Sequence, residues 1–420
     1  MRDLLAFIDA SPCAWFAADT LVEELTEAGF RPLDLTVPAW DLSPGRWYVR
    51  REAAVIGFVL RDKVRPQRFH LVGAHTDSPH LRLKPRPAFT AEGCLQLGVE
   101  VYGGALHNSW LDRDLGLAGT VHLAGGALRT VRLDQPIARV PQLAIHLDRR
   151  INEDGLKLNP QQHLAPIWGL ANGRDPDLEF RSMLATAAGV DPGEILGHDL
   201  SLYDLTPARR GGVRNELVFA GRLDNLASCH AGVMALIAAA EGQPEVMPVL
   251  ACFDHEEVGS ESRSGANGEL LGGILERILL ELGGDRRAFL AALAGSFLLS
   301  ADMAHAAHPS YPERHEPRHK PRLGAGPVLK SNSNQRYATS AASAARVREL
   351  ARKVDVPLQD FVARTDLGCG STIGPACGAN LGVAVADLGT PMLSMHSARE
   401  CAAVADHGAY VRLLAAHLHG

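Results

Sequence analysis

The pattern of apolar and polar positions differs between two parts of this chain. Near the N-terminus, Ser11-Pro12 can cap and begin a helix, an apolar helical stripe follows, and Gly29 ends it. The pattern that predicts mixed helices and strands is found again after Leu217. Buried-type strands are predicted at 47–49, 54–60, 69–74, 246–253, 297–303, 360–364 and 383–387, and helices at 225–240, 270–282, 286–293, 340–354 and 409–418. Pro248 places the strand 246–253 near a sheet edge at its beginning.

The middle of the chain has a different pattern, in which short β-type runs are separated by Gly and Pro. Strands are predicted there at 95–102, 119–123, 128–133 and 143–146, with one helix at 178–188. We therefore expect a discontinuous α/β domain, residues 1–82 and 213–420, with a mixed sheet flanked by helices. A mainly-β domain, residues 83–212, is inserted into it.

Composition excludes several classes of protein. The chain has 420 residues, enough for two domains. A net charge of −6 and a pI near 6.3 argue against a nucleic-acid partner. No apolar run approaches the roughly 18 residues of a membrane span, and the N-terminus lacks a signal-peptide layout. Seven scattered cysteines without a Cys-x-x-Cys pair suit reduced thiols in a cytoplasm.

Candidate chemistry begins in Leu71-Val-Gly-Ala-His-Thr-Asp-Ser-Pro79. The apolar run predicts a buried strand, and His75 and Asp77 follow at its end, where Pro79 enforces a turn. Open α/β sheets place their sites at such ends. Imidazole is a good metal ligand, and a nearby carboxylate can orient it. Alone, a His-x-Asp pair is weak evidence for a site.

Four further segments also end an apolar run in residues that can bind metal. Each has a plain structural explanation: Asp224 could cap a helix, Glu256-Glu257 could be a solvated strand end, Asp302 could cap a turn, and His396 could be a core histidine. The joint occurrence of five such strand ends is much harder to dismiss. The four segments are Gly221-Arg-Leu-Asp-Asn225, Phe253-Asp-His-Glu-Glu-Val-Gly259, Ser300-Ala-Asp-Met-Ala-His305 and Met395-His-Ser-Ala-Arg-Glu400.

This inventory is what a two-metal hydrolase needs. Each ion takes imidazole and carboxylate ligands and keeps one position open for water. Two ions about 3.5–4 Å apart need a bridging ligand, and a carboxylate has two oxygens for that purpose. Another carboxylate must accept the proton of the water. Because Glu256 and Glu257 are adjacent at a strand end, one can bind metal while the other faces the water.

The chain resembles the aspartyl aminopeptidases, peptidase family M18. The matching motifs occur in order across nearly the whole chain. They are Gly73-Ala-His-Thr-Asp-Ser-Pro79, Trp110-Leu-Asp-Arg-Asp-Leu115, Ala144-Ile-His-Leu-Asp148, Gly221-Arg-Leu-Asp-Asn225, Phe253-Asp-His-Glu-Glu-Val-Gly-Ser260, Asp302-Met-Ala-His-Ala-Ala-His-Pro309, Gly326-Pro-Val-Leu-Lys330, Asn334-Gln-Arg-Tyr337, Gly370-Ser-Thr-Ile-Gly-Pro375 and Met395-His-Ser-Ala-Arg-Glu400.

The resemblance implies a role for each ligand-type residue. His75, Asp224 and Asp302 would hold one ion; Asp224, Glu257 and His396 would hold the other, with Asp224 bridging. Glu256 would be the general base for a water between the metals, and Asp77 would orient His75. The two ions would be zinc, with cobalt or manganese as alternatives.

The resemblance also implies a substrate and an assembly. The substrates would be peptides with N-terminal Asp or Glu. Lys330 would meet the substrate carboxylate and Tyr337 would be its neighbour, although Lys330 on its own reads as a surface lysine. His146, in the inserted domain, would reach the active site of a neighbouring subunit in a tetrahedral dodecamer.

Two other functions stay open. One is an enzyme with the same metal site that acts on neutral N-termini or acylated amines. The other is a non-catalytic binding protein with a relic site, against which the complete ligand set argues.

Overall fold

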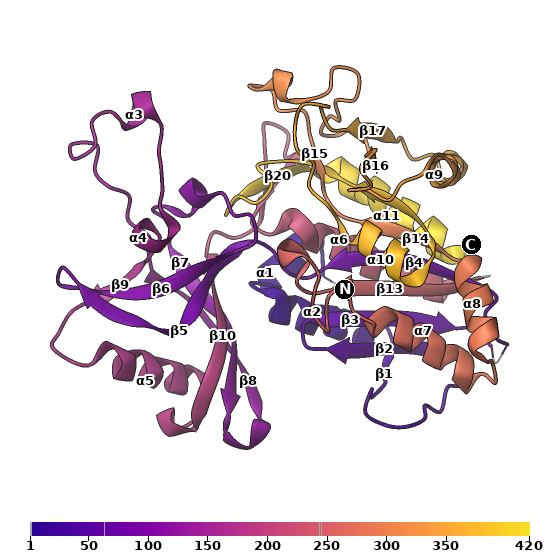
Figure 1. The fold of residues 1–420 in the computed structure, drawn as a ribbon, viewed down its shortest axis with the longest axis horizontal. Helices are drawn as coiled ribbons and strands as arrows, with labels where there is room; N and C mark the ends of the chain where they lie inside the picture. The colour runs from indigo at the N-terminus through magenta and orange to yellow at the C-terminus, as the bar shows by residue number, and fades with distance from the viewer. Residues whose placement is uncertain (1, 63, 243, 245) are drawn as a thin grey trace. The chain divides into compact units, whose positions relative to one another are not determined.

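The computed structural model describes residues 2–420 apart from 63, 243 and 245. The chain forms two compact units (Figure 1). Unit 1 comprises Met1–Asp77, Ala208–Met395 and Glu400–Gly420, and unit 2 comprises Ser78–Pro207 and His396–Arg399. Unit 2 therefore begins at residue 78 and its main segment ends at residue 207, compared with the predicted 83 and 212. The reason is that strand β5 (His80–Ala91) already pairs within the sheet of unit 2.

A nine-stranded mixed sheet is the framework of unit 1, as the sequence predicted for the α/β domain. Its four central strands, β13, β4, β14 and β18, run parallel to one another. In spatial order the strands are β1 (Arg31–Pro32), β2 (Gly45–Arg51), β3 (Ala54–Leu60), β13 (Met247–Phe253), β4 (Phe69–His75), β14 (Phe297–Ala301), β18 (Ala384–Gly389), β16 (Val328–Ser331) and β17 (Gln359–Val362).

Helices cover both faces of this sheet (Figure 1). Successive side chains of β4 alternate between two hydrophobic cores: Val72 and Ala74 belong to one, and Phe69 and Leu71 to the other. A strand buried on both faces reads as a continuous apolar run. The first core contains α1 (Leu4–Ala10), α2 (Ala14–Glu27), α6 (Leu223–Glu241), α9 (Ala341–Lys353) and α11 (Val404–His419), and the second contains α7 (Leu270–Glu281), α8 (Arg286–Ala294) and α10 (Ile373–Leu381).

Helix α6 lies at the centre of the first core. By length and composition alone it could cross a membrane, but 83% of its apolar window is buried inside the protein, as in the core helix of a globular domain. Unit 1 also has a five-stranded sheet. Its strands are β11 (Arg209–Gly211), β12 (Leu217–Ala220), β20 (Glu400–Ala403), β19 (Pro391–Leu393) and β15 (Ala304–His305).

Unit 2 is built on a six-stranded antiparallel sheet, which agrees with the predicted mainly-β character. The helix α5 (Pro176–Ala188) packs on it through Phe180 and Leu184. Its strands are β8 (Leu128–Ala138), β7 (Leu115–Leu123), β10 (Ile195–Asp204), β5, β6 (Cys94–Tyr102) and β9 (Ile167–Leu170). The short helices α3 (Ile151–Asp154) and α4 (Pro160–His163) complete the unit, and short 3₁₀ turns in the two units are His107–Trp110, Ala124–Gly126, Pro192–Glu194, Glu256–Val258 and Pro312–Arg314.

Three predictions of local structure were wrong. Ser11 and Pro12 do not cap and begin the helix that follows: Ser11 lies at the C-terminal end of α1, and α2 begins at Ala14 after Cys13. Residues 143–146 do not form a strand; they lie in an exposed turn-rich segment. The strand β13 is not at an edge but between β3 and β4. Pro248 is tolerated there because the antiparallel pairing with β3 begins only at Val249.

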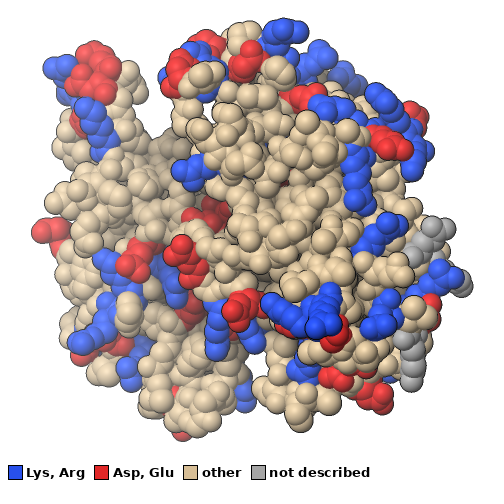
Figure 2. All heavy atoms as spheres, turned by 45° about the vertical axis from the view of Figure 1, so that its right-hand side comes forward, with Lys and Arg blue, Asp and Glu red and all other residues tan. Residues whose placement is uncertain are grey.

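Charged side chains of both signs are interspersed over the face drawn in Figure 2. This mixed surface is what a net charge of −6 in 420 residues leads one to expect.

The packing of Gly389 gives a test of the sheet. A Cβ at this position would lie 1.7 Å from the carbonyl oxygen of Asp302, so any larger residue must push that backbone aside. We expect Gly389→Ala to lower the free energy of unfolding by about 1–3 kcal/mol. Urea denaturation of the purified chain measures the change.

The control is Gly408→Ala in α11. A Cβ there meets no atom within 4 Å, and alanine favours a helix over glycine by up to about 1 kcal/mol. Equal denaturation midpoints for Gly389→Ala and the unsubstituted protein would contradict the close approach of β18 to Asp302.

Candidate metal centre

Neighbouring strands of the nine-stranded sheet bring the candidate ligands together. His75 is the last residue of β4, Asp302 directly follows β14, and Glu256 and Glu257 follow β13. Because β4 lies between β13 and β14 and all three are parallel, their carboxyl ends meet at one edge. Asp224 joins them from the first turn of α6, where its peptide bond to Asn225 is cis.

The separations between these side chains fit a metal ion. His75 Nε2 lies 3.6 Å from Asp224 Oδ1 and 3.7 Å from Asp302 Oδ1. Two ligand atoms that are each about 2.1 Å from a tetrahedral zinc ion are about 3.4 Å apart. The three side chains are almost completely buried. Within the described residues, the ligand atoms of His75, Asp224 and Asp302 all lie within 4.8 Å of one another, and so do those of His75, Glu256 and Glu257. This donor set therefore fits a divalent cation.

Asp77 fixes the orientation of His75. Its Oδ1 lies 3.3 Å from His75 Nδ1, which leaves the Nε2 lone pair facing the other ligands. The same carboxylate accepts hydrogen bonds from the backbone N–H groups of Glu256 and Glu257, each at 3.1 Å. Asp77 thus links the ends of β4 and β13 and places both glutamates. That Asp77 orients His75 for metal binding stays a prediction.

Burial and neighbouring charges raise the pKa of three side chains in the cluster. Burial, together with the carboxylates of Asp302, Asp77 and Asp224, raises the pKa of Glu256 to about 8. Burial likewise raises the pKa of Glu257, and the negative charge of Asp224 raises it further. For His75, burial opposes protonation, but hydrogen bonds to Asp302 and Asp77 outweigh it and raise the pKa. Without metal, the cluster is therefore expected to retain protons, which a divalent cation would displace.

Asp302 remains ionised because of Lys330. Burial alone would raise the pKa of Asp302, but the Lys330 ammonium and the hydrogen bond with His75 hold it well below its usual range. Lys330 is 1% exposed, so it is not the surface lysine that its sequence context allowed. Tyr337 is also buried, and its ring centre lies 5.1 Å from Lys330 Nζ. Contact of either residue with a substrate stays a prediction.

Two predicted residues belong to unit 2. His396 Nδ1 lies 3.1 Å from the carbonyl oxygen of Gly104, and the N–H of Leu106 donates to the carbonyl of His396. His146 lies in the exposed segment that follows β8. The metal-binding role of His396 and the intersubunit role of His146 stay predictions.

Two residues to which the sequence analysis assigned no role form hydrogen bonds with the backbone of candidate ligands. Glu400 Oε2 accepts a hydrogen bond from the backbone N–H of Asp224 at 3.2 Å. The thiol of Cys229 donates to the carbonyl of His75 at 2.9 Å. Glu400 lies in one of the family motifs, so the sequence could have indicated its importance. Cys229 could be recognised only as a core residue, and it does lie in the core.

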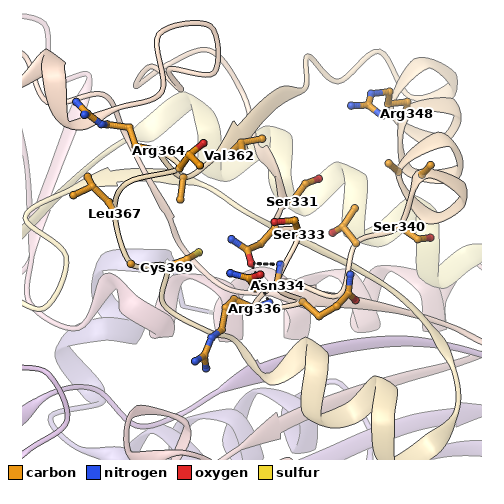
Figure 3. A pocket seen from close by; sticks show the side chains of 18 residues that line it. Ser331, Ser333, Asn334, Arg336, Ser340, Arg348, Val362, Arg364, Leu367 and Cys369 are labelled. Carbon is orange, nitrogen blue, oxygen red and sulfur yellow. Dashed lines mark hydrogen bonds between the residues drawn. The ribbon is translucent and has the colours of Figure 1, made fainter.

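Two cavities are lined by residues that follow Asp302 and Lys330 in the chain. One, of about 320 Å³, is lined by His305, His308 and Arg314. The other, of about 960 Å³, is lined by residues 331–336 and 362–365, among others (Figure 3). It begins one residue beyond Lys330, and Ser331, Ser333 and Asn334 give it a polar lining. The two cavities share Val362–Arg364, so together they offer space for a ligand larger than one side chain.

The chain is similar to known zinc peptidases over its full length. The family described as aminopeptidase I zinc metalloprotease (M18) matches residues 7–417. A probable M18 family aminopeptidase 2 from Streptomyces avermitilis is 48% identical and covers 100% of this chain and 97% of the relative.

Among solved structures, Ape4 in its complex with Nbr1 is 39% identical with a TM-score of 0.94, covering 99% of this chain and 85% of that one. A subunit of the S. cerevisiae mApe1 dodecamer is 28% identical with a TM-score of 0.85, covering 98% and 94%. The match over nearly the whole chain agrees with the resemblance seen in its motifs. The chain therefore belongs to the M18 family of zinc metallo-aminopeptidases.

Proposed function

We propose that this aminopeptidase removes N-terminal Asp and Glu residues from peptides with the help of two divalent metal ions. The observation that carries the proposal is the buried cluster of His75, Asp224 and Asp302, with Glu256 Oε2 4.0 Å from His75 Nε2. One imidazole and several carboxylates around one point suit zinc, cobalt or manganese.

In the proposed arrangement, His75, Asp224 and Asp302 hold one ion. Asp224 and Glu257 hold the second, to which the sequence adds His396. When bound, such ions polarise the scissile carbonyl and lower the pKa of water. Asp224 suits the bridging position because a carboxylate has two oxygens and because Glu400 fixes its backbone.

Glu256 is the proposed general base. The backbone N–H of Glu256 is bonded to Asp77, so the turn after β13 is held in place without the carboxylate of Glu256. That carboxylate therefore stays available beside the cluster. A carboxylate in this position takes a proton from the attacking water and then gives it to the leaving amine.

The 320 Å³ cavity supports acidic specificity. His308 Nδ1 accepts a hydrogen bond from the N–H of Ser310, which leaves its Nε2–H as a donor. Arg314 contributes a guanidinium to the same lining. A substrate carboxylate satisfies such donors better than an apolar side chain does.

We further propose that the protein is a homo-oligomer located in the cytoplasm, with a tetrahedral dodecamer as the expected assembly. The exposed segment around His146 carries Leu143, Ile145 and Leu147, of which Leu147 is 75% exposed. Apolar side chains at this density favour burial against another chain. The similar mApe1 of S. cerevisiae is a dodecamer.

Replacing the base is the direct test of the mechanism. Glu256→Gln keeps the size of the side chain but cannot accept a proton, so we expect kcat to fall by about 10²–10⁴-fold. Both metals should remain bound by elemental analysis. Glu261→Gln, an exposed glutamate nearby, is the control and should keep full turnover. Undiminished turnover in Glu256→Gln would refute the assignment of the base.

A substrate panel tests the specificity. Aspartyl and glutamyl chromogenic amides should be hydrolysed with kcat/KM values at least about tenfold above that of the leucyl amide, because an acidic side chain can accept hydrogen bonds from His308 and Arg314 in the cavity and an apolar one cannot. N-acetyl substrates should not react. Preference for leucyl or N-acetyl substrates would instead support a neutral aminopeptidase or a deacylase with the same metal site.

The raised pKa of Glu256 predicts how the metal-free protein responds to pH. In the unfolded chain this carboxyl loses its proton near pH 4.5, whereas in the folded protein it keeps it to about pH 8. The free energy of unfolding should therefore fall as pH rises from about 4.5 to 8, by on the order of a few kcal/mol. Denaturant titrations with a chelator at pH 5, 6.5 and 8 measure it. Adding zinc should restore stability at pH 8, and a flat profile without metal would contradict the crowding of carboxylates.

A further inference from the structure

Unit 2 holds a small cavity of about 120 Å³, lined by α5, β5 and β10. Residues 85–87 of β5 and 195–198 of β10 form two of its walls. Among the described residues that line it, none is a candidate metal ligand. One face of α5 forms the third wall with side chains about one helical turn apart, namely Asp177, Phe180, Arg181 and Leu184.

The cavity lies where β5 leaves β10. The two strands pair at Leu81 and Arg82 of β5. Residues 84–87 then form a bulge in the pairing of β5 with β6. Pro85 and Pro87 lie in this bulge, and neither has an N–H that could continue the pairing with β10. Between the two strands this leaves a gap, which α5 covers from one face of the sheet.

Two guanidinium groups at the cavity lack protein partners. Within the described part of the chain, the side chains of Arg86 and Arg181 form neither a hydrogen bond nor an ion pair. Asp177 precedes Arg181 by four residues on α5, a spacing that favours ion pairs, yet these two form none. Two guanidiniums and one carboxylate give the lining a net positive charge, in a chain whose net charge is −6.

The imidazole of His198 adds a third polar group to the lining. Both of its ring nitrogens are shielded from solvent, and neither has a hydrogen-bond partner of ordinary geometry among the residues described. The adjacent carboxylate of Asp199 is engaged by Arg82 at 2.9 Å. Burial lowers the pKa of His198, although the charge of Asp199 and the carbonyl of Pro85 oppose the shift. The neutral ring has one N–H to donate, and leaving it unpaired costs stability.

We propose that this cavity binds a phosphate group. Guanidinium groups bind phosphate oxygens through paired N–H···O bonds, and Arg86 and Arg181 reach the cavity from two different elements. His198 offers a further donor. Three donor groups suit a tetrahedral anion better than a carboxylate, which one guanidinium can satisfy. The volume of 120 Å³ is below the roughly 300 Å³ at which pockets for whole small molecules begin. The site is independent of the metal centre and of the peptide substrate.

Calorimetric titration of the metal-bound, full-length protein with inorganic phosphate tests the proposal. Arg181→Gln and Arg86→Gln each remove one guanidinium, so each should raise the dissociation constant about 10–100-fold. The matched control is Arg174→Gln. Arg174 is exposed and lies just before α5 but does not line the cavity, so its loss changes the net charge equally and should leave phosphate binding unchanged.

A third variant tests the imidazole. His198→Phe keeps a ring that can pack against Phe180, whose ring centre is 5.8 Å away, but removes both nitrogens. We expect it to raise the dissociation constant about tenfold. If it fails to fold, the two arginine variants still decide the question, because Arg86 and Arg181 are exposed and leave the hydrophobic core intact.

Titration with methyl phosphate distinguishes the two sources of this chemistry. Binding at least as tight as that of inorganic phosphate would support the proposal and assign the site to a phosphate monoester whose remainder lies outside the cavity. Weaker binding would also support it and assign the site to free phosphate. In both cases Arg181→Gln must weaken the binding.

Three outcomes would overturn the proposal. Phosphate binding of equal affinity in Arg86→Gln and Arg181→Gln would belong to the metal ions. Absence of binding by the unsubstituted protein at about 10 mM phosphate would mean that the cavity holds water alone. A smaller assembly of the arginine variants in sedimentation velocity would assign these side chains to a contact between subunits.

Discussion

The structure depends on the confinement of several carboxylates and one imidazole in a space that excludes water. Asp77, Asp224, Asp302, Glu256 and Glu257 all repel one another, and burial makes that repulsion stronger. Only cations or protons can relieve it. Lys330 supplies one permanent charge at Asp302, and the pKa shifts show that the remaining demand exceeds what this lysine and His75 provide. A divalent metal answers that demand by displacing the protons, so its binding should strengthen as pH rises.

Sheet topology is what allows such repelling groups to remain together. Three parallel strands end side by side, so His75, Asp302 and the two glutamates follow strands whose two faces are both packed by helices, while Asp224 comes from α6. The backbone positions are then set by hydrophobic burial, which is far larger than the repulsion at the edge. Hydrogen bonds from Glu400 and Cys229 to the ligand segments add direction to this support. Stability therefore comes from the hydrophobic cores, and the electrostatic repulsion is concentrated at the site.

Much of this could be predicted from the sequence, for a physical reason. A strand buried on both faces reads as an apolar run, and a ligand-type residue at its end stands out, as His75 and Asp302 do. Features that depend on the pairing of distant strands could not be predicted from the sequence. The position of β13 inside the sheet, despite Pro248, follows from where its pairing with β3 begins. The apolar residues around His146 gave a strand-like pattern although the segment pairs with nothing in the described chain.

Lys330 shows where sequence reasoning stops and why. In sequence, an apolar Gly-Pro-Val-Leu before a lysine allows a solvated charge or a substrate contact, because nothing local says which side the ammonium faces. The structure decides it by burying Lys330 in β16, with its ammonium 3.0 Å from the carbonyl oxygens of Asp302 and Met303. A lysine that the sequence leaves open to solvent can thus be buried beside a candidate metal ligand, and only the packing of distant strands shows this.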